Sequence, residues 1–145
     1  MIRSPRLLVV EDNEGDVRLV QEALKYSNSP CELTVAKDGI EAIECLRLLA
    51  ASATAPDLIL LDLNLPLKDG REVLQEIKQD DDLKHIPVLV FTSSRAPEDV
   101  LSAYRLHANC YLAKPARMNE FFGLLASIEE FWTRLAHLPA LTTGS

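Results

Sequence analysis

The stretch of sequence that most restricts the possible folds is an unbroken apolar run that leads directly into a carboxylate. Residues 58–61 are Leu-Ile-Leu-Leu, and Asp62 follows them. Short unbroken apolar runs are typical of strands buried on both faces, as in a parallel sheet covered by helices. Pro66 and the Asp69-Gly70 pair then predict a loop. Because ligands of open α/β sheets bind beyond the carboxyl ends of the strands, Asp62 is a candidate reactive group.

The rest of the chain alternates between apolar runs and stretches of helical periodicity. Further strands are predicted at about 7–10, 33–36, 87–91 and 110–113, each followed by a helix, the last of which spans about 118–135. This alternation predicts an α/β fold, a doubly wound five-stranded parallel sheet with right-handed crossovers and helices on both faces. We expect one domain over residues 1–138 and a polar C-terminal tail over 139–145.

Composition narrows the possible partners. The net charge of −7 argues against a nucleic-acid partner, since phosphate backbones require an excess of Lys and Arg. No apolar stretch approaches transmembrane length and no basic helical patch is present, so we expect no membrane partner. Cys31, Cys45 and Cys110 are far apart and form no CxxC pair, which predicts reduced thiols in a cytoplasmic protein.

Polar side chains stand where four of the predicted strands end. Glu11 and Asp12 follow the first strand, Asp62 the third, Thr92 the fourth and Lys114 the fifth. At one edge of a sheet, three carboxylates repel one another unless a cation joins them, and such hard oxygen ligands suit Mg²⁺. A lysine and a hydroxyl nearby can hold phosphoryl oxygens. The set predicts phosphoryl transfer, with Asp62 as the nucleophile that forms an acyl phosphate.

Each of these residues also has a purely structural explanation. Glu11 and Asp12 could complement a helix dipole, Thr92 could cap a helix, and Lys114 could be a surface lysine. Their joint occurrence at strand ends favours the functional interpretation. For another group of side chains we favour the structural explanation, because the histidines fit no metal-ligand spacing. This group comprises Ser93, Ser94, His85, His107 and His137.

Four motifs together resemble the receiver domain of response regulators. They are V-E-D-N-E-G-D at 10–16, L-L-D-L-N-L-P-L-K-D-G at 60–70, V-F-T-S-S at 90–94 and Y-L-A-K-P at 111–115. The resemblance covers about residues 5–136 and implies the strand order 2-1-3-4-5. A closer similarity, to the small single-domain receivers that partner bacterial phytochrome histidine kinases, rests on residues 106–111, Phe131-Trp132 and Leu138-Pro139.

The resemblance implies a role for each acidic site residue. Asp62 corresponds to the phosphoacceptor and Asp12 to a direct ligand of Mg²⁺ or Mn²⁺. Glu11 corresponds to the acid that reaches the metal directly or through water, and it is longer than the Asp often found there. Asn64 corresponds to the position whose backbone carbonyl binds the metal.

The resemblance also implies roles for the residues at the ends of the fourth and fifth strands. Thr92 corresponds to the hydroxyl that moves onto the phosphoryl group, and Lys114 to its ammonium partner. Tyr111 corresponds to an aromatic switch that turns inward when Thr92 moves; its structural alternative is a half-buried strand aromatic. The Lys114–Pro115 peptide bond corresponds to one that is cis in the family.

The implied function is that of a signalling receiver, not an enzyme. A sensor histidine kinase, of phytochrome type, would phosphorylate Asp62, and output would pass through a protein surface because few residues follow the last predicted helix. A haloacid-dehalogenase-type phosphatase needs a second Asp where Asn64 stands. A flavodoxin-like protein is disfavoured because the acids at 11–14 would repel its phosphate. A scaffold that acts without phosphorylation is the third alternative, and the complete set of site residues argues against it.

The last helix suggests an interface. Its main apolar stripe, which we expect to pack on the sheet, comprises Phe121, Leu125, Ile128, Trp132 and Leu135. Leu124, Phe131 and Leu138 add apolar surface beside that stripe. We hypothesise a homodimer through the face between the fourth and the last helix, promoted by phosphorylation. The alternative is a wide stripe that faces only the core.

Overall fold

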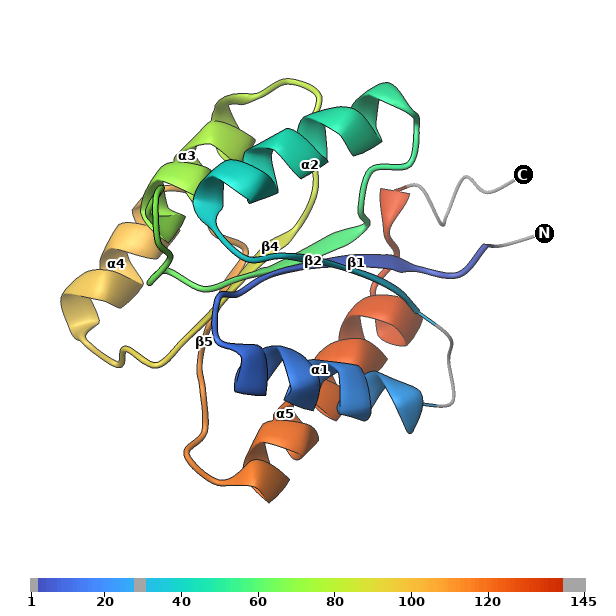
Figure 1. Ribbon diagram of the computed structural model, residues 1–145, viewed down its shortest axis with the longest axis vertical. Helices are drawn as coiled ribbons and strands as arrows, with labels where there is room; N and C mark the ends of the chain where they lie inside the picture. Colours follow the sequence, from blue (N-terminus) through green and yellow to red (C-terminus); the bar gives the residue numbers. More distant parts are fainter. Residues whose placement is uncertain (1–2, 28–30, 140–145) are drawn as a thin grey trace.

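The fold is built on one parallel sheet with the strand order β2-β1-β3-β4-β5. The computed structural model describes residues 3–27 and 31–139. Every neighbouring pair of strands is parallel, which confirms the predicted doubly wound α/β fold and its strand order (Figure 1). The strands are β1 (Arg6–Val10), β2 (Glu32–Ala36), β3 (Leu58–Leu61), β4 (Val88–Thr92) and β5 (Cys110–Ala113).

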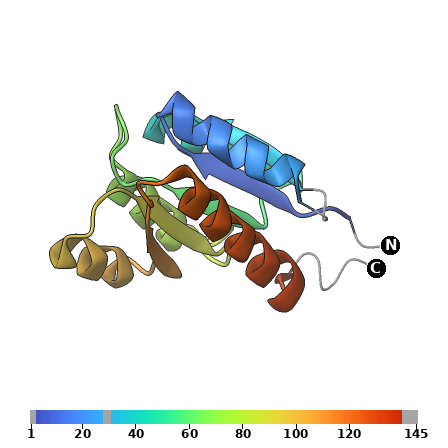
Figure 2. The same cartoon turned by 90° about the horizontal axis from the view of Figure 1, so that it is seen from below.

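Helices cover both faces of the sheet. Two of them, α1 (Glu14–Lys25) and α5 (Met118–Glu130), lie side by side on one face (Figures 1 and 2). The other face carries α2 (Gly39–Ala51), α3 (Gly70–Gln79) and α4 (Pro97–Arg105). No helix in the described part of the chain is long and apolar enough to cross a membrane.

The sheet separates two apolar clusters, and strand periodicity divides its side chains between them. In β1, Leu8 and Val10 belong to the cluster under α2 and α3, whereas Leu7 and Val9 belong to the cluster under α1 and α5. All four residues of β3 are buried. The unbroken apolar run therefore has the structure that a strand between two helical layers requires.

A capped helix follows each of the first three strands in the chain, after a short connection for α1 and α2 and after the loop 62–69 for α3. The side chains of Asn13, Asp38 and Asp69 accept hydrogen bonds from backbone N–H groups in the first turns of α1, α2 and α3. Asp is a preferred N-cap residue, and at Asp38 the capping bond, from the nitrogen of Glu41, is 2.7 Å long. The N-termini of these three helices therefore lie on the side of the sheet where its strands have their carboxyl ends.

The final helical segment does not continue as one regular α-helix. Helix α5 ends at Glu130, and a π-helical turn, η1 (Phe131–Leu135), follows it. The predicted end at about residue 135 agrees with the structure, but the predicted helix type does not. Of the predicted tail 139–145, the part from residue 140 on lies outside the described residues.

Two glycines allow backbone segments to approach beside Asp62. A Cβ atom at Gly70 would lie 2.3 Å from the backbone oxygen of Asp62 and 2.5 Å from the Cα of Leu63. A Cβ atom at Gly39 would lie 2.1 Å from the backbone oxygen of Lys68. Only glycine avoids these overlaps, so the N-termini of α3 and α2 are packed against the segment that follows Asp62.

We expect Gly70→Ala to lower the free energy of unfolding by about 2–3 kcal/mol, because the added methyl group overlaps backbone atoms that cannot move independently. The control is Gly123→Ala in α5, where a Cβ atom meets open space. That variant should gain about 0.5–1 kcal/mol through its higher helix propensity. Urea denaturation followed by circular dichroism measures both, and equal midpoints for the two variants would contradict the packing argument.

Candidate functional site

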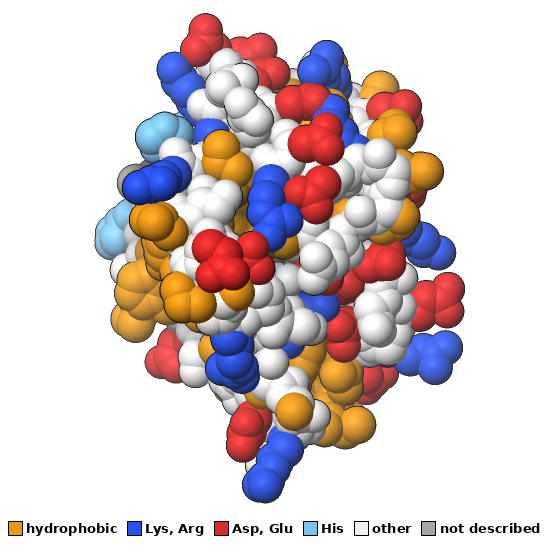
Figure 3. Space-filling model, turned by 90° about the vertical axis from the view of Figure 1, so that its left-hand side faces the viewer, with side chains coloured by type: hydrophobic (Ala, Val, Ile, Leu, Met, Phe, Trp, Pro, Cys, Tyr) orange, Lys and Arg blue, Asp and Glu red, His pale blue; other side chains and the backbone are white. Residues whose placement is uncertain are grey.

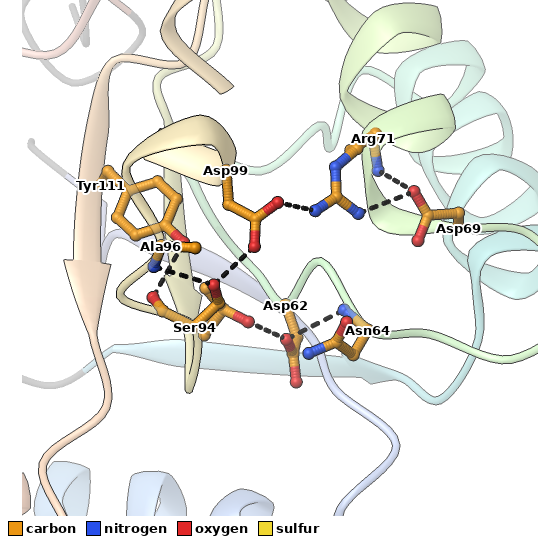
Figure 4. A network of polar contacts seen from close by, with 9 residues as sticks. Asp62, Asn64, Asp69, Arg71, Ser94, Ala96, Asp99 and Tyr111 are labelled. Carbon is orange, nitrogen blue, oxygen red and sulfur yellow. Dashed lines mark hydrogen bonds and ion pairs between the residues drawn. The ribbon is translucent and has the colours of Figure 1, made fainter. Parts of the chain in front are cut away.

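The carboxyl edge of the sheet brings Asp62 together with two side chains from the next strands. The Asp62 carboxylate is only 6% exposed. Its Oδ1 accepts a hydrogen bond from Thr92 Oγ1 at 2.7 Å and one from the backbone N–H of Asn64 at 3.1 Å (Figure 4). Its Oδ2 accepts a hydrogen bond from Lys114 Nζ at 3.0 Å. Both oxygens of a buried carboxylate are thus satisfied by protein donors.

The Lys114 ammonium joins three carboxylates. It lies 3.0 Å from Asp62 Oδ2 and 2.8 Å from Asp16 Oδ2, and it also pairs with Glu11. The lysine side chain is 8% exposed, so bulk water screens these interactions weakly. The role of Asp16 was not predicted from the sequence. Its position in the first turn of α1, directly after the strand-end acids, was the signal that could have indicated it.

The surroundings shift the pKa values of all three central groups. Burial, followed by the charge of Asp62, raises the pKa of Glu11 to about 7, although Lys114 opposes the shift. Burial also acts to raise the pKa of Asp62, but Thr92, Lys114 and the Asn64 N–H outweigh it, and the pKa is lowered. For Lys114, burial acts to lower the pKa, but the bonds to Asp16 and Glu11 outweigh it and the pKa is raised. Asp62 is therefore an anion beside a cation at neutral pH.

One group of acids in the described part of the chain has the geometry for a cation. Carboxylate oxygens of Glu11, Asp12 and Asp62 lie within 4.8 Å of one another, with Asp12 on the exposed side. Oxygen ligands on a site with one open side fit a hydrated Mg²⁺ or Mn²⁺ ion. The expected fourth contribution, from the backbone carbonyl of Asn64, stays a prediction.

Tyr111 contacts the loop that follows Thr92. Its hydroxyl donates a hydrogen bond to the backbone carbonyl of Ser94 at 2.9 Å, and its half-buried ring packs against the core under α2 and α3 (Figure 4). Ser94, for which only a structural role was expected, donates its hydroxyl to Asp99 at 2.5 Å. Nothing in the local sequence around Ser94 indicates that partnership.

The Lys114–Pro115 peptide bond was expected to be cis, and this prediction is wrong for this structure. The described residues contain no cis peptide bond. The preference between the isomers of an X–Pro bond is small, about 0.5–1 kcal/mol. With the trans bond, Lys114 still reaches all three carboxylates.

Some side chains near the C-terminus differ from the prediction in how far they are buried. Phe131 is 52% exposed, and Leu124 is half-buried against the core under α1 and α5. Leu135, expected on the sheet-facing stripe, is 65% exposed. The wider π turn, closed by a hydrogen bond from Ala136 to Phe131, rotates it away from that stripe. Leu138, expected on the surface, is buried because the chain becomes extended at Ala136, and it lines an apolar recess with residues of β1, β3 and α5.

A comparison with protein families matches residues 7–126 to the family described as the response regulator receiver domain. The chain therefore belongs to the response regulator receivers, signalling domains of two-component systems. It is 49% identical over 136 residues to the response regulator Rcp1 of Synechocystis sp., covering 92% of each chain. It is 36% identical to the probable methanogenesis regulatory protein FilR2 of Methanothrix harundinacea, covering 87% of this chain and 82% of that protein.

Solved structures agree with this assignment. The phosphorylated cyanobacterial phytochrome response regulator RcpA superposes with a TM-score of 0.90 at 50% identity, covering 94% of this chain and 99% of that one. The Mn²⁺-bound form of Rcp1 gives a TM-score of 0.86 at 48% identity, with the same coverage. The bacteriophytochrome response regulator AtBRR gives 0.70 at 38% identity, covering 94% and 98%.

We expect Lys114→Met to lower the free energy of unfolding at pH 7 in the presence of a chelator by about 3–5 kcal/mol. The change leaves buried carboxylates, among them Asp62 and Glu11, without their cation. The control is Lys84→Met, because Lys84 pairs with a side chain that is 90% exposed and its loss should cost about 0–1 kcal/mol. Urea titration of both variants gives the comparison; similar losses would show that Lys114 does not hold the acids together.

Proposed function

We propose that this protein accepts a phosphoryl group from a histidine kinase on Asp62 and then changes its interaction surface. One observation carries the proposal: a buried, ionised carboxylate at a strand end is held by a hydroxyl and an ammonium group, Thr92 and Lys114. Beyond its own phosphorylation and dephosphorylation, we propose no enzymatic activity. The unpaired cysteines support a reducing compartment, and we propose the cytoplasm.

The reaction suits the protonation states of these residues. Asp62 is an anion, so it can attack phosphorus without first losing a proton. A bond forms between a carboxylate oxygen and phosphorus, and the bond between phosphorus and the histidine nitrogen breaks, with the electron pair staying on the ring. Thr92 and Lys114 already donate to the Asp62 oxygens, so both lie within reach of the oxygens of a phosphoryl group placed there.

Glu11, Asp12 and Asp62 would hold the Mg²⁺ or Mn²⁺ ion, with the Asn64 carbonyl as the proposed further ligand. When bound, the ion supplies positive charge that offsets the repulsion between the acids and the incoming phosphate. The Mn²⁺-bound structure of Rcp1 supports this choice of metal.

The donor that we propose is a phytochrome-type histidine kinase. Support comes from the similarity to RcpA, described as a cyanobacterial phytochrome response regulator, and from the 49% identity to Rcp1 over nearly the whole chain. The switch residues would be Thr92 and Tyr111: Thr92 begins the segment 92–94 and donates to Asp62, and Tyr111 donates to the carbonyl of Ser94 at its end. A phosphoryl group adds about one to two negative charges beside them, enough to bias a loop with two arrangements.

Incubation with acetyl phosphate and Mg²⁺, followed by intact mass spectrometry, tests the phosphoacceptor. We expect one phosphoryl adduct on the wild type, none on Asp62→Asn, and none when a chelator replaces Mg²⁺. The matched control is Asp38→Asn, which alters another acid beyond a strand end but keeps a residue that caps α2 equally well. It should be phosphorylated like the wild type.

An adduct on Asp62→Asn, or the absence of one from the wild type, would contradict the assignment. Repeating the assay with an autophosphorylated phytochrome kinase and with an unrelated histidine kinase tests the donor. Transfer at equal rates from both would contradict the proposed phytochrome specificity.

We also propose that phosphorylation promotes a homodimer through the face between α4 and α5, including Leu124 and Phe131. Exposed apolar side chains support an interface there, since Leu101 is 51%, Tyr104 47% and Phe131 52% exposed. Figure 3 shows the side of the molecule that includes α4, where hydrophobic side chains stand beside acidic and basic ones. Such a mixture is typical of interfaces that form reversibly.

Sedimentation velocity tests the dimer. The change Phe131→Asp should weaken association of the phosphorylated protein by about tenfold or more, because it places a charge at the centre of an apolar contact. The control, Leu48→Asp, alters a residue that is 70% exposed on α2, a helix that lies away from α4 and α5 (Figure 1). Association that does not depend on phosphorylation, or an equal effect of both changes, would exclude this interface.

A further inference from the structure

A line of polar contacts connects α3 to the loop between β4 and α4. The guanidinium of Arg71, on α3, lies with Nη2 2.6 Å from Asp99 Oδ1, on α4 (Figure 4). The other oxygen, Asp99 Oδ2, accepts the hydroxyl of Ser94 at 2.5 Å. The carboxylate of Asp99 therefore stands between the two partners and uses one oxygen for each. We call Arg71, Asp99 and Ser94 the brace.

At its α3 end, the brace is anchored to the segment that carries the phosphoacceptor. Arg71 contacts the Asp69 carboxylate with its backbone N–H at 3.1 Å and its guanidinium at 3.3 Å. The next residue back, Gly70, donates its N–H to the carbonyl of Leu63 at 3.0 Å and packs directly against the backbone of Asp62. The first turn of α3 is thus fixed relative to Asp62.

At its other end, the brace holds the β4–α4 loop, which follows Thr92, the last residue of β4, and which Tyr111 of β5 contacts. Ser94 follows Thr92 by two positions, and its hydroxyl accepts the N–H of Ala96 at 3.2 Å. Its carbonyl accepts the Tyr111 hydroxyl, while Thr92 donates to Asp62. The contacts form a closed ring that runs from Asp62 through α3, the brace and the β4–α4 loop back to Asp62.

The start of α4 gives the brace more weight than an ordinary surface ion pair, which contributes little to stability. The N-cap position of α4 is Ala96, which has no side-chain oxygen to cap the helix. Instead, the Ser94 hydroxyl accepts the N–H of Ala96 and donates to Asp99, so it joins the N-cap residue to the first turn of the helix. The orientation of a helix of only nine residues therefore depends on this group of contacts.

We propose that Arg71, Asp99 and Ser94 are positioning residues that hold the β4–α4 loop so that Thr92 meets Asp62 and Tyr111 meets Ser94. This inference rests on the proposed function, since it assigns the brace a part in phosphorylation of Asp62. Without the brace, the loop takes up several arrangements, and Thr92 faces the phosphoacceptor for a smaller fraction of the time.

Two readouts test the brace in the full chain. The first is the ¹⁹F spectrum of unphosphorylated protein that contains 3-fluorotyrosine, with the Tyr111 signal assigned through Tyr111→Phe. The second is the rate of phosphorylation by acetyl phosphate with Mg²⁺. We expect Asp99→Asn and Ser94→Ala to shift or broaden the Tyr111 signal and to slow phosphorylation about fivefold each.

Control variants distinguish the loss of the brace from other effects of a substitution near the start of α4. Glu98→Gln removes an exposed charge from the same first turn of α4 and should leave both readouts within about twofold of the wild type. Ser94→Thr retains the hydroxyl and should restore most of the rate. The double variant Asp99→Asn with Ser94→Ala should be no slower than the slower single variant, because both changes break one network.

The outcomes distinguish the brace from the proposed function. If the wild type is phosphorylated but Asp99→Asn behaves like Glu98→Gln in both readouts, the brace is overturned and the function stands. If the wild type is not phosphorylated on Asp62, the proposed function fails. The Tyr111 signal then decides alone, and an unchanged signal in both Asp99→Asn and Ser94→Ala overturns the brace. Should one variant fail to fold, as judged by circular dichroism, the other gives the result.

Discussion

The site depends on one buried ammonium group that holds several carboxylates together. A parallel sheet brings the side chains beyond its strands to a single edge, and here those side chains include Glu11 and Asp62. Their mutual repulsion would disfavour such an edge if Lys114, directly after β5, did not contact both of them and Asp16 as well. The same arrangement leaves Asp62 ionised, with its two oxygens oriented by separate donors. The interactions that offset the repulsion between the acids are therefore the same ones that keep Asp62 ionised and oriented.

The surrounding fold fixes this edge from both helical layers. On one side, α1 contributes Asp16; on the other, the first turn of α3 packs against the Asp62 backbone through Gly70. Thr92, at the end of β4, donates to Asp62, and the loop that follows it contacts Tyr111 of β5 and Asp99 of α4. If Asp62 is the phosphoacceptor, as we propose, a change there reaches β5 and α4 through direct contacts. A signalling domain needs such a path, and this one is short and built from hydrogen bonds that can exchange partners.

Features encoded by local periodicity could be predicted from the sequence. The buried strands, the alternation with helices and the cap at Asp38 followed from the spacing of apolar residues and from helix-start chemistry. Strand topology then placed Asp62, Thr92 and Lys114 at one edge without any knowledge of their rotamers. Other features depend on contacts between distant elements or on helix phase. The partnership of Arg71 with Asp99 spans 28 residues, and the π turn that exposes Leu135 changes the phase of a stripe that looked regular.

The most direct measurement is a crystal structure of the protein with Mg²⁺ and with Asp62 phosphorylated. The predicted result has the ion among Glu11, Asp12 and Asp62, the phosphoryl group on Asp62, and Thr92 Oγ1 and Lys114 Nζ within hydrogen-bond distance of phosphoryl oxygens. A phosphoryl group on another residue would contradict the assignment. So would an ion bound elsewhere, or a Lys114 that remains on Glu11 and Asp16 and makes no contact with the phosphoryl group.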